Sequence, residues 1–568
     1  MKEKIALILK KTIKNLGVDL KNEQIEKMLE IPPSSELGDY SFPCFSLASS
    51  FKENPAKIAE KIKLSLSSVS LVDHIETKGP YLNFFLNKEK ISQEIVKEIL
   101  SEKEKFGKPE QIPKKKIKTM IEFSQPNTHK AFHVGHIRGT SIGESLARIF
   151  EFCGETVIRA NYQGDTGMHV AKWIWCYKKY HAKEELKKDE SWVASIYVEA
   201  VKKLAQDEEM QKEVDIINKK LFERTDKQLN ELWKKTRKLS LDALEKIYKE
   251  LNTHFDVYLF ESEIEKQGKE IAEELLKKKI AILSDDAVIM DLNEYNLGVW
   301  VLLRKDKTVL YSAKDLALVE QKFKEFKLDK NIYVIGAAQS LHMAQLFKTL
   351  ELMKFKQVKE CEFIPFSEIR LPTGKMSSRT GDNILYSDFI KEMTDYSKKE
   401  IKSRNPEISK TELEERALKI SIASIKYSLL KQSSNKVIVF NKEDALNFEG
   451  DSGAYILYSY ARANSILEKA NKKIKKEFVV KNLEEKEFEL TKKLFQFKEI
   501  VLNAYTNKSQ ATIANYSYQL AQLFNEFYHA CPVINSENES FRLALVSSFK
   551  QVLKSSLYLL GIETIEEM

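Results

Sequence analysis

Cysteine is scarce in this chain. Its five residues stand far apart in the sequence: Cys44, Cys153, Cys176, Cys361 and Cys531. There is no Cys-x-x-Cys pair and no close, even spacing, so neither a disulfide framework nor a zinc site built on cysteines is indicated. This usage suits a reducing cytoplasm, which is the location we expect.

Long apolar runs are missing as well. No stretch approaches the roughly 20 apolar residues that a membrane-spanning helix needs, so we predict that the chain does not cross a membrane. The apolar run within Met1 to Lys10 is too short for the core of a signal peptide. We interpret this segment as an amphipathic first helix.

The excess of positive charge is small, at +8 over 568 residues. Basic surface attracts phosphates, so the charge slightly favours a polyanionic partner. Lysine-rich compositions also occur in proteins that bind no nucleic acid, and the charge by itself leaves both alternatives open.

The first part of the chain has the pattern of a small α+β domain over residues 1–108. Asn54-Pro55 offers a helix N-cap followed by proline at the first helical position. Tyr81 to Leu86, which follows Gly79-Pro80, is typical of a strand. The lysine-rich segment from Lys105 to Lys118 contains two prolines that break any helix, so we interpret it as a linker.

Residues 114–400 show the pattern of a parallel α/β sheet, in which strands alternate with glycine-punctuated loops and helices. Lys/Glu-rich helical patterns at about 178–280 predict an inserted helical subdomain, after which sheet-like sequence resumes at 287–291. Residues 401–568 carry apolar and aromatic side chains at helical spacing and predict a separate all-helical bundle.

A first motif lies where a predicted strand, Lys118 to Phe123, leads through a loop into His133-Val-Gly-His136 and a helix. Such a loop presents unpaired backbone N–H groups and the positive end of the helix dipole, where a phosphate binds. Two imidazoles in the first turn can face one ligand, and Gly135 would let a base or a phosphate approach the backbone. This geometry favours a nucleotide site.

Two other interpretations of these histidines remain open. They could be core histidines with satisfied hydrogen bonds, or they could form a metal cluster together with His129 and His169. A tetrahedral cluster would need a carboxylate or thiolate nearby, and the spacing offers none. We therefore expect no structural metal.

A second motif, Pro372-Thr-Gly-Lys-Met-Ser-Ser-Arg-Thr-Gly-Asp382, is a small basic loop that alone would be typical of the surface. In a chain with the histidine motif, a cationic loop suits the departure of pyrophosphate from ATP. When the α-phosphate is attacked, negative charge grows on the leaving oxygens, and cations together with Mg²⁺ stabilise it. We therefore expect ATP as a substrate, with Mg²⁺ bound to it.

The two motifs, His133-Val-Gly-His136 and Lys375-Met-Ser-Ser-Arg379, resemble the two signatures of class I aminoacyl-tRNA synthetases. Other segments resemble the arginyl-tRNA synthetase family: Ile121 to Asn127, Arg159 to Gly167, Tyr311 to Asp315 and Tyr333 to Gln339. Segments near both termini do so too: Gly38 to Pro43, Gly79 to Phe84, Phe527 to Val533 and Leu560 to Ile562. The resemblance spans essentially the whole chain.

This resemblance implies a Rossmann-like catalytic domain, an α+β N-terminal domain that contacts tRNA and a helical anticodon-binding domain. The implied activity is arginine–tRNA ligation, in which L-arginine and ATP form arginyl-adenylate and the arginine passes to tRNA(Arg), with release of AMP and pyrophosphate. A monomer is expected. Bases of the anticodon arm could lie on tyrosine rings of the bundle, although most of these could equally be core residues: Tyr455, Tyr458, Tyr460, Tyr516 and Tyr518.

The resemblance also implies site residues, with positive groups around the histidine motif holding the triphosphate beside an acidic cavity. ATP would be bound by His133, Gly135, His136, Lys375, Met376, Ser377 and Ser378. Arginine would be bound by Glu122, Asn127, Tyr311, Asp315 and Gln339. Glu122, Asp315 and the Tyr311 hydroxyl are suitable acceptors for a planar guanidinium, and the two amides suit the α-ammonium and α-carboxylate. Tyr311 and Asp315 could otherwise be an ordinary i, i+4 pair on a helix.

The second motif departs from the family pattern, because Ser378 and Arg379 stand where a second lysine is usual. The cation that stabilises the leaving pyrophosphate must then come from elsewhere. Many members of the family resemble this chain in carrying a lysine just before the histidine motif, here Lys130, and we predict that it takes over this charge. The predicted catalytic residues are Lys130, His133, His136, Lys375 and Arg379.

Two other functions are compatible with the motifs. A small nucleotidyltransferase could share the histidine motif, but it would not need a C-terminal bundle or a basic N-terminal module. A catalytically silent RNA-binding relative could keep the fold. The intact His133, His136, Glu122 and Asp315 speak against such a loss of chemistry.

Overall fold

The computed structural model describes residues 2–66, 71–109, 116–207, 209–372, 374–375, 384–475 and 477–568. They form two compact units. One contains Met1–Lys103, Ile466–Phe495 and Leu523–Phe549, and the other contains Glu104–Ser465, Gln496–Gln522 and Lys550–Met568. In the described ranges, no helix combines the length and the apolar character that a membrane span requires.

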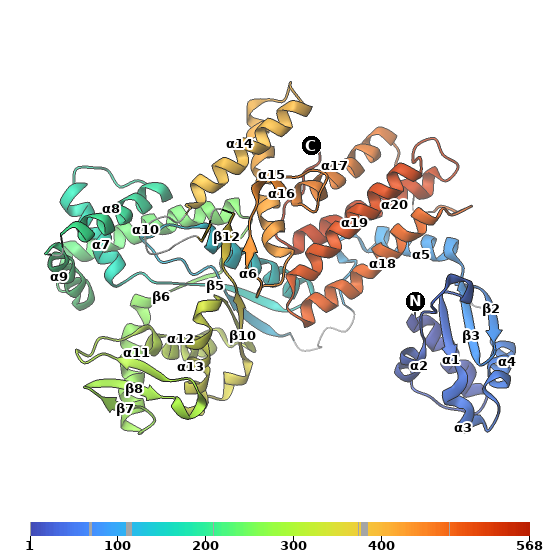
Figure 1. Ribbon diagram of the computed structural model, residues 1–568, viewed down its shortest axis with the longest axis horizontal. Coiled ribbons are helices and arrows are strands. Elements are labelled where there is room, and N and C mark those ends of the chain that lie inside the picture. Colours follow the sequence, from blue (N-terminus) through green and yellow to red (C-terminus); the bar gives the residue numbers. More distant parts are fainter. Residues whose placement is uncertain are drawn as a thin grey trace. The chain divides into compact units, whose positions relative to one another are not determined.

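The N-terminal part of the first unit is a three-stranded antiparallel sheet with helices packed on it (Figure 1). Its strands lie in the order β1 (Tyr40–Pro43), β3 (Tyr81–Leu86) and β2 (Val72–Lys78). Its helices are α1 (Lys2–Asn15), α2 (Asn22–Met28), α3 (Ala48–Phe51) and α4 (Pro55–Ser65). The helix α5 (Lys88–Glu102) follows the sheet, and its Lys97 pairs with Glu477 of the same unit at 2.8 Å. The predicted helix start is confirmed, because the Asn54 side chain accepts a hydrogen bond from the Ala56 N–H at 2.9 Å.

The C-terminal part of the chain is almost entirely helical, as predicted. Besides the short strand β14 (Ile438–Val439), it contains α14 (Tyr386–Arg404), α15 (Lys410–Leu430), α16 (Lys442–Ala445), α17 (Gly453–Ala470), α18 (Glu485–Thr506), α19 (Gln510–Ala530) and α20 (Glu539–Leu559). Tyr460 and Tyr516 are each 1% exposed and belong to the core, so they cannot carry stacked bases. Tyr455 and Tyr518 are partly buried, and their ring centroids lie 5.6 Å apart.

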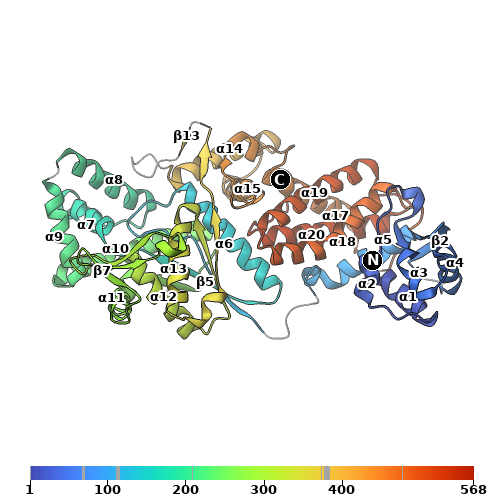
Figure 2. The ribbon, with the colours of Figure 1, turned by 60° about the horizontal axis from the view of Figure 1, so that its bottom comes forward.

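The centre of the second unit is a five-stranded parallel sheet (Figures 1 and 2). Its strands lie in the order β11 (Cys361–Phe366), β10 (Lys330–Gly336), β4 (Lys118–Glu122), β5 (Thr156–Gln163) and β6 (Val257–Phe260). Helix α6 (Val134–Phe152) contacts three of these strands. A separate core joins the sheet to α11 (Glu261–Lys277), α12 (Tyr311–Phe326) and α13 (Ser340–Leu352). The predicted Rossmann-like α/β sheet is confirmed.

The strand order of this sheet reverses at β4, which is its central strand. From β4 it proceeds to β5 and β6 on one side, and it then continues to β10 and β11 on the other side of β4. The loops that follow β4 and β10 therefore diverge, and the crevice between them is where ligands bind in sheets of this kind. Glu122, the last residue of β4, lies opposite Tyr333 of β10 in this register.

Two details of residues 114–400 differ from the sequence-based expectation. The range 178–280, expected to be a helical insertion, contains the sheet strand β6 as well as the end of α7 (Met168–Tyr180) and the helices α8 (Glu190–Gln206), α9 (Met210–Glu223), α10 (Lys227–Glu250) and α11. β6 has only four residues, which is too short to produce an alternating pattern between long helices. The expected strand at 287–291 exists as β8 (Ala287–Asp291), but it pairs antiparallel with β7 (Ile282–Ser284) and β9 (Val299–Leu303) in another sheet.

Helix α6 approaches the loop after β4 most closely at Gly143. A Cβ atom on Gly143 would lie 2.1 Å from Cγ of the fully buried Phe123. We expect Gly143→Ala to lower the free energy of unfolding by about 1–3 kcal/mol, because a packed core has no room for the extra methyl group. Urea denaturation measures this loss. Gly336→Ala is the control, since a Cβ there meets no atom within 4 Å, and an equal loss in both variants would contradict the packing argument.

Candidate active site

A cavity of about 400 Å³ lies at the crevice that the topology indicates. Its lining includes all five residues expected to bind arginine: Glu122, Asn127, Tyr311, Asp315 and Gln339. They come from the end of β4, the loop that follows it, the first turns of α12 and the segment after β10. Side chains that are distant in the sequence thus meet at the carboxyl edge of the sheet.

The carboxylate of Glu122 is already occupied by other side chains. It is 3% exposed, forms an ion pair with Lys322, and accepts a hydrogen bond from Gln125 Nε2 at 2.8 Å. Lys322 is fully buried. Because this buried ammonium neutralises the carboxylate, Glu122 offers little net charge to a ligand and mainly shapes one side of the cavity. The expectation that Glu122 is one of the acceptors of the guanidinium stays a prediction.

Tyr311 and Asp315 lie on one face of α12, four residues apart. Asp315 Oδ2 lies 2.6 Å from His342 Nε2, and no described residue donates to Asp315 Oδ1. Tyr311 is 57% exposed, and its ring centroid lies 4.8 Å from that of His342. A carboxylate oxygen and a phenolic hydroxyl at the edge of the cavity therefore remain as acceptors for a ligand.

Sequence reasoning missed other residues that line the cavity, among them Tyr162, Glu261 and His342. Glu261 begins α11 and pairs with Lys314 at 3.2 Å, and burial raises its pKa. The Tyr162 hydroxyl is buried without a partner among the described residues, and burial holds its pKa well above the usual value, so it stays protonated. Glu261 was hidden inside the expected insertion. Recognition of β6 would have pointed to it, because it follows the carboxyl end of a parallel strand.

The two histidines of the first motif are tied into the first turn of α6. His133 is the N-cap, and its Nδ1 accepts a hydrogen bond from the Gly135 N–H at 3.1 Å. His136 Nδ1 accepts from the His133 N–H at 3.1 Å, and the ring centroids lie 3.9 Å apart. Because both Nδ1 atoms are acceptors, each neutral ring carries its proton on Nε2.

Both imidazoles are uncharged at neutral pH. Burial, followed by the charge of Lys130, lowers the pKa of His133 to about 4. Burial, followed by His133 and Lys130, lowers the pKa of His136 well below its usual value. The two imidazoles therefore add no positive charge to this turn. Burial and the neighbouring Lys172 lower the pKa of Lys130 itself.

The structure explains the glycine at position 135 by the neighbouring side chain, whereas the sequence-based expectation was the approach of a ligand. A Cβ atom at this position would lie 2.9 Å from two atoms of the His133 imidazole. Such a contact is too close for an unstrained side chain, so a larger residue would displace the ring. Gly135 therefore makes room for the His133 side chain, in addition to any approach of a ligand.

The other two histidines near the motif are hydrogen-bonded within the protein. The ring nitrogens of His129 contact the hydroxyl groups of Thr128 at 3.0 Å and Thr236 at 2.8 Å. His169 Nε2 lies 3.2 Å from the Gly164 carbonyl oxygen. These positions match the alternative of core histidines and do not match a four-histidine metal cluster.

Among the described residues, one group could bring metal ligands together: Cys176, His181 and Glu199. The two ring nitrogens of His181 already face Glu184 at 2.6 Å and Glu199 at 2.9 Å. Lys203 also pairs with Glu199, at 3.4 Å. The carboxylates of Glu184 and Glu199 are thus paired with His181 and Lys203. None of these residues lines the cavity.

The loop of the second motif lies mostly outside the described residues. This applies to Met376, Ser377, Ser378 and Arg379. The backbone of Lys375 is described as the end of β13 (Gly374–Lys375), which pairs with β12 (Ile369–Leu371).

Both flanks of that loop are attached to α6 or to the residues just before it. On the N-terminal side, Arg138 of α6 donates a hydrogen bond to the Ser367 carbonyl oxygen at 2.6 Å. On the C-terminal side, the Tyr386 N–H donates to the Phe132 carbonyl oxygen at 2.9 Å. These attachments hold the described flanks of the second motif close to the helix that carries the first.

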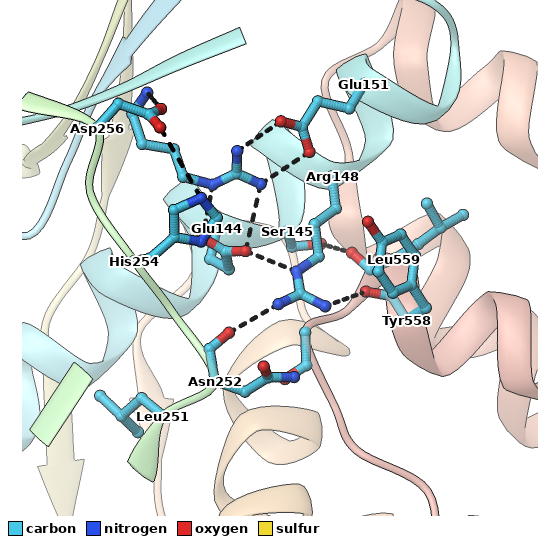
Figure 3. A network of polar contacts seen from close by, with 12 residues as sticks. Glu144, Ser145, Arg148, Glu151, Leu251, Asn252, His254, Asp256, Tyr558 and Leu559 are labelled. Carbon is cyan, nitrogen blue, oxygen red and sulfur yellow. Dashed lines mark hydrogen bonds and ion pairs between the residues drawn. The ribbon is translucent and has the colours of Figure 1, made fainter. Parts of the chain in front are cut away.

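The second half of α6 is held by a network of polar contacts (Figure 3). Glu144 accepts hydrogen bonds from Arg148 Nε at 2.6 Å and from Arg159 Nε at 3.0 Å. Arg148 also donates to the carbonyl oxygens of Asn252 at 2.8 Å and Tyr558 at 3.2 Å. Since Arg159 belongs to β5, these buried ion pairs fix the helix that carries the histidine motif against the sheet.

Comparisons with protein families cover most of the chain. Residues 95–441 match the tRNA synthetases class I (R) catalytic domain, which is more than half of the chain. Residues 3–86 match the arginyl tRNA synthetase N terminal domain, and residues 456–568 match the DALR anticodon binding domain.

Whole proteins match over nearly their full length. An arginine–tRNA ligase of Clostridium acetobutylicum is 36% identical over 558 residues, which is 98% of each chain. One of Clostridium perfringens is 37% identical over 97% of this chain and 98% of its own. The solved structure of Thermus thermophilus arginyl-tRNA synthetase superposes with a TM-score of 0.76, at 25% identity and with complete coverage of both chains. This chain belongs to the arginyl-tRNA synthetase family.

Proposed function

We propose that this protein is an arginine–tRNA ligase. A carboxylate oxygen of L-arginine attacks the α-phosphorus of ATP, and pyrophosphate leaves. The terminal ribose hydroxyl of tRNA(Arg) then attacks the carbonyl carbon of arginyl-adenylate, and AMP leaves. One observation carries the proposal: the chain from Glu122 to His136 lines the cavity at its start and forms the first turn of α6, a helix N-terminus that suits a phosphate, at its end.

The guanidinium group of arginine is bound by Asp315 Oδ1 and the Tyr311 hydroxyl, with the carboxylate of Glu261 in the same cavity. A guanidinium has five N–H donors and no acceptor, so a lining of carboxylate and hydroxyl oxygens suits it. Asn127 and Gln339 bind the α-ammonium and α-carboxylate groups. This orientation directs the reacting carboxylate towards the ATP site.

ATP is bound at the start of α6, with Mg²⁺ on its phosphates. His133 and His136 donate their Nε2–H groups to phosphate oxygens, as neutral donors. Lys130 stabilises the pyrophosphate as it leaves, together with the second motif, which contributes Lys375 and Arg379.

The parts outside the sheet bind tRNA(Arg). We assign residues 1–108 to an N-terminal tRNA-contacting domain, 114–400 to the catalytic domain and 401–568 to the anticodon-binding domain. Tyr455, Tyr458 and Tyr518 are only partly buried, and anticodon bases stack on some of them. The protein acts as a monomer in the cytoplasm.

ATP–pyrophosphate exchange, measured with each of the twenty amino acids and with or without total tRNA, tests this function. We expect exchange that depends on arginine and requires tRNA, with other amino acids at least about 100-fold less efficient. Exchange that proceeds with lysine or glutamate instead would overturn the substrate assignment. The absence of exchange with any amino acid would support a catalytically silent relative.

A further inference from the structure

Asp315 is one end of a chain of hydrogen bonds that leads from the cavity into the protein core. His342 Nε2 lies 2.6 Å from Asp315 Oδ2, and the Trp300 indole N–H donates to His342 Nδ1 at 3.2 Å. Trp300 is 4% exposed, whereas the side chains of His342 and Asp315 are 16% and 19% exposed. The three residues belong to β9, α13 and α12, so the chain connects three separate elements.

The indole group sets the direction of these hydrogen bonds. An indole N–H can only donate, so His342 Nδ1 is the acceptor. In the neutral imidazole the proton is then on Nε2, where it is donated to Asp315. Because the buried indole holds the ring from behind, the imidazole has one orientation, and the carboxylate that it contacts is held in one plane.

His342 also contacts the second proposed acceptor of the guanidinium. Its ring packs against Tyr311 with centroids 4.8 Å apart and an interplanar angle of 62°. One imidazole therefore touches both Asp315 and Tyr311. It bonds only Oδ2 of the carboxylate and leaves Oδ1 for a ligand.

We propose that His342, oriented by Trp300, is a positioning residue that fixes the plane of the Asp315 carboxylate and thereby favours arginine over lysine. This inference rests on the proposed binding of the guanidinium by Asp315 and Tyr311. A planar guanidinium forms paired hydrogen bonds only with a carboxylate that lies in its plane. The tetrahedral ammonium of lysine has no such requirement. Loss of His342 therefore weakens arginine binding more than lysine binding.

The test is ATP–pyrophosphate exchange in the presence of tRNA, with arginine and with lysine, for His342→Ala, His342→Gln and Trp300→Phe. In His342→Ala we expect the KM for arginine to rise by about 10- to 100-fold, while the KM for ATP stays unchanged. The ratio of kcat/KM for arginine to that for lysine falls by about tenfold. In His342→Gln the amide group can still donate to Asp315, so most of the activity and of the ratio returns.

Trp300→Phe separates positioning from a merely structural role. It removes the indole N–H and keeps an aromatic ring, so the ¹⁵N signal of His342 Nδ1 should move, because this nitrogen loses its donor. The KM for arginine should rise by less than it does in His342→Ala. His254→Ala removes an exposed histidine of the same unit and should change none of these values.

The outcomes separate the inference from the proposed function. A wild-type protein without arginine-dependent exchange would refute the proposed function. An active wild type, with an unchanged arginine KM and an unchanged arginine-to-lysine ratio in His342→Ala, would overturn the inference. If circular dichroism shows that His342→Ala does not fold, Trp300→Phe decides: a shifted Nδ1 signal with an unchanged arginine KM and an unchanged arginine-to-lysine ratio would overturn it.

Discussion

Asp315→Asn should remove most of the ability of the protein to activate arginine. We expect kcat/KM for arginine in pyrophosphate exchange to fall by about 10²- to 10³-fold, because a charge that faces a guanidinium in a partly desolvated cavity is lost. The substitution keeps the volume of the side chain. Its amide oxygen can still accept the hydrogen bond from His342, and the amide NH2 group then stands in the place of Oδ1, so the change removes both the charge and the acceptor that face the guanidinium.

The specificity of this effect is measurable in the same assay. The KM for ATP should not change, since Asp315 lies in the arginine cavity and not at the histidine motif. Asp291→Asn makes the same change in charge at an exposed position on β8 and should behave as wild type. A fall of only about threefold in Asp315→Asn would be the size of an exposed ion pair and would exclude Asp315 as the main partner of the guanidinium.

Lys130→Ala should slow the formation of arginyl-adenylate about 10²-fold or more, because it removes a preorganised cation from beside the leaving pyrophosphate. Lys130 is next to the histidine turn, where both imidazoles are neutral at pH 7. Neither imidazole therefore replaces the lost ammonium. Pre-steady-state pyrophosphate release, measured with saturating arginine and tRNA, reports this rate.

A second consequence of Lys130→Ala does not depend on catalysis. The charge of Lys130 is one of the causes that lower the pKa of His133, so this pKa should rise from about 4 in the variant, as NMR titration can show. Lys178→Ala removes a lysine from the exposed end of α7 and serves as the control for both measurements. A near-normal rate of adenylate formation in Lys130→Ala would reject the assignment of the leaving-group cation to this residue.

Elements with strong local signals could be predicted from the sequence. The strand that starts at Lys118 and the helix after His133 follow from apolar spacing and turn residues, and the N-cap at Asn54 follows from a side chain that bonds its own helix. β6 could not be predicted in this way, since four residues between long helices carry too little pattern. The pairing of β8 could not be predicted either, because strand partners are chosen by contacts that are not local.

The same division holds for the candidate site. The residue types in the cavity could be named in advance, because a guanidinium needs acceptor oxygens and a triphosphate needs cations and free N–H groups. The sequence did not reveal that Lys322 forms an ion pair with Glu122, which is 200 residues away. It also did not reveal that Asp315 is hydrogen-bonded to His342, and His342 to Trp300.

By itself, the sequence determined which chemical groups this protein has and which local turns present them. The tertiary structure decided which of those groups carry charge and which acceptors are left for a ligand. Ionisation depends on burial and on the nearest charges, as the neutral His133 beside Lys130 shows. The ionisation of a group and the acceptors left for a ligand both depend on distances in space. The spacing of residues along the chain specifies such distances only within a helical turn or between paired strands.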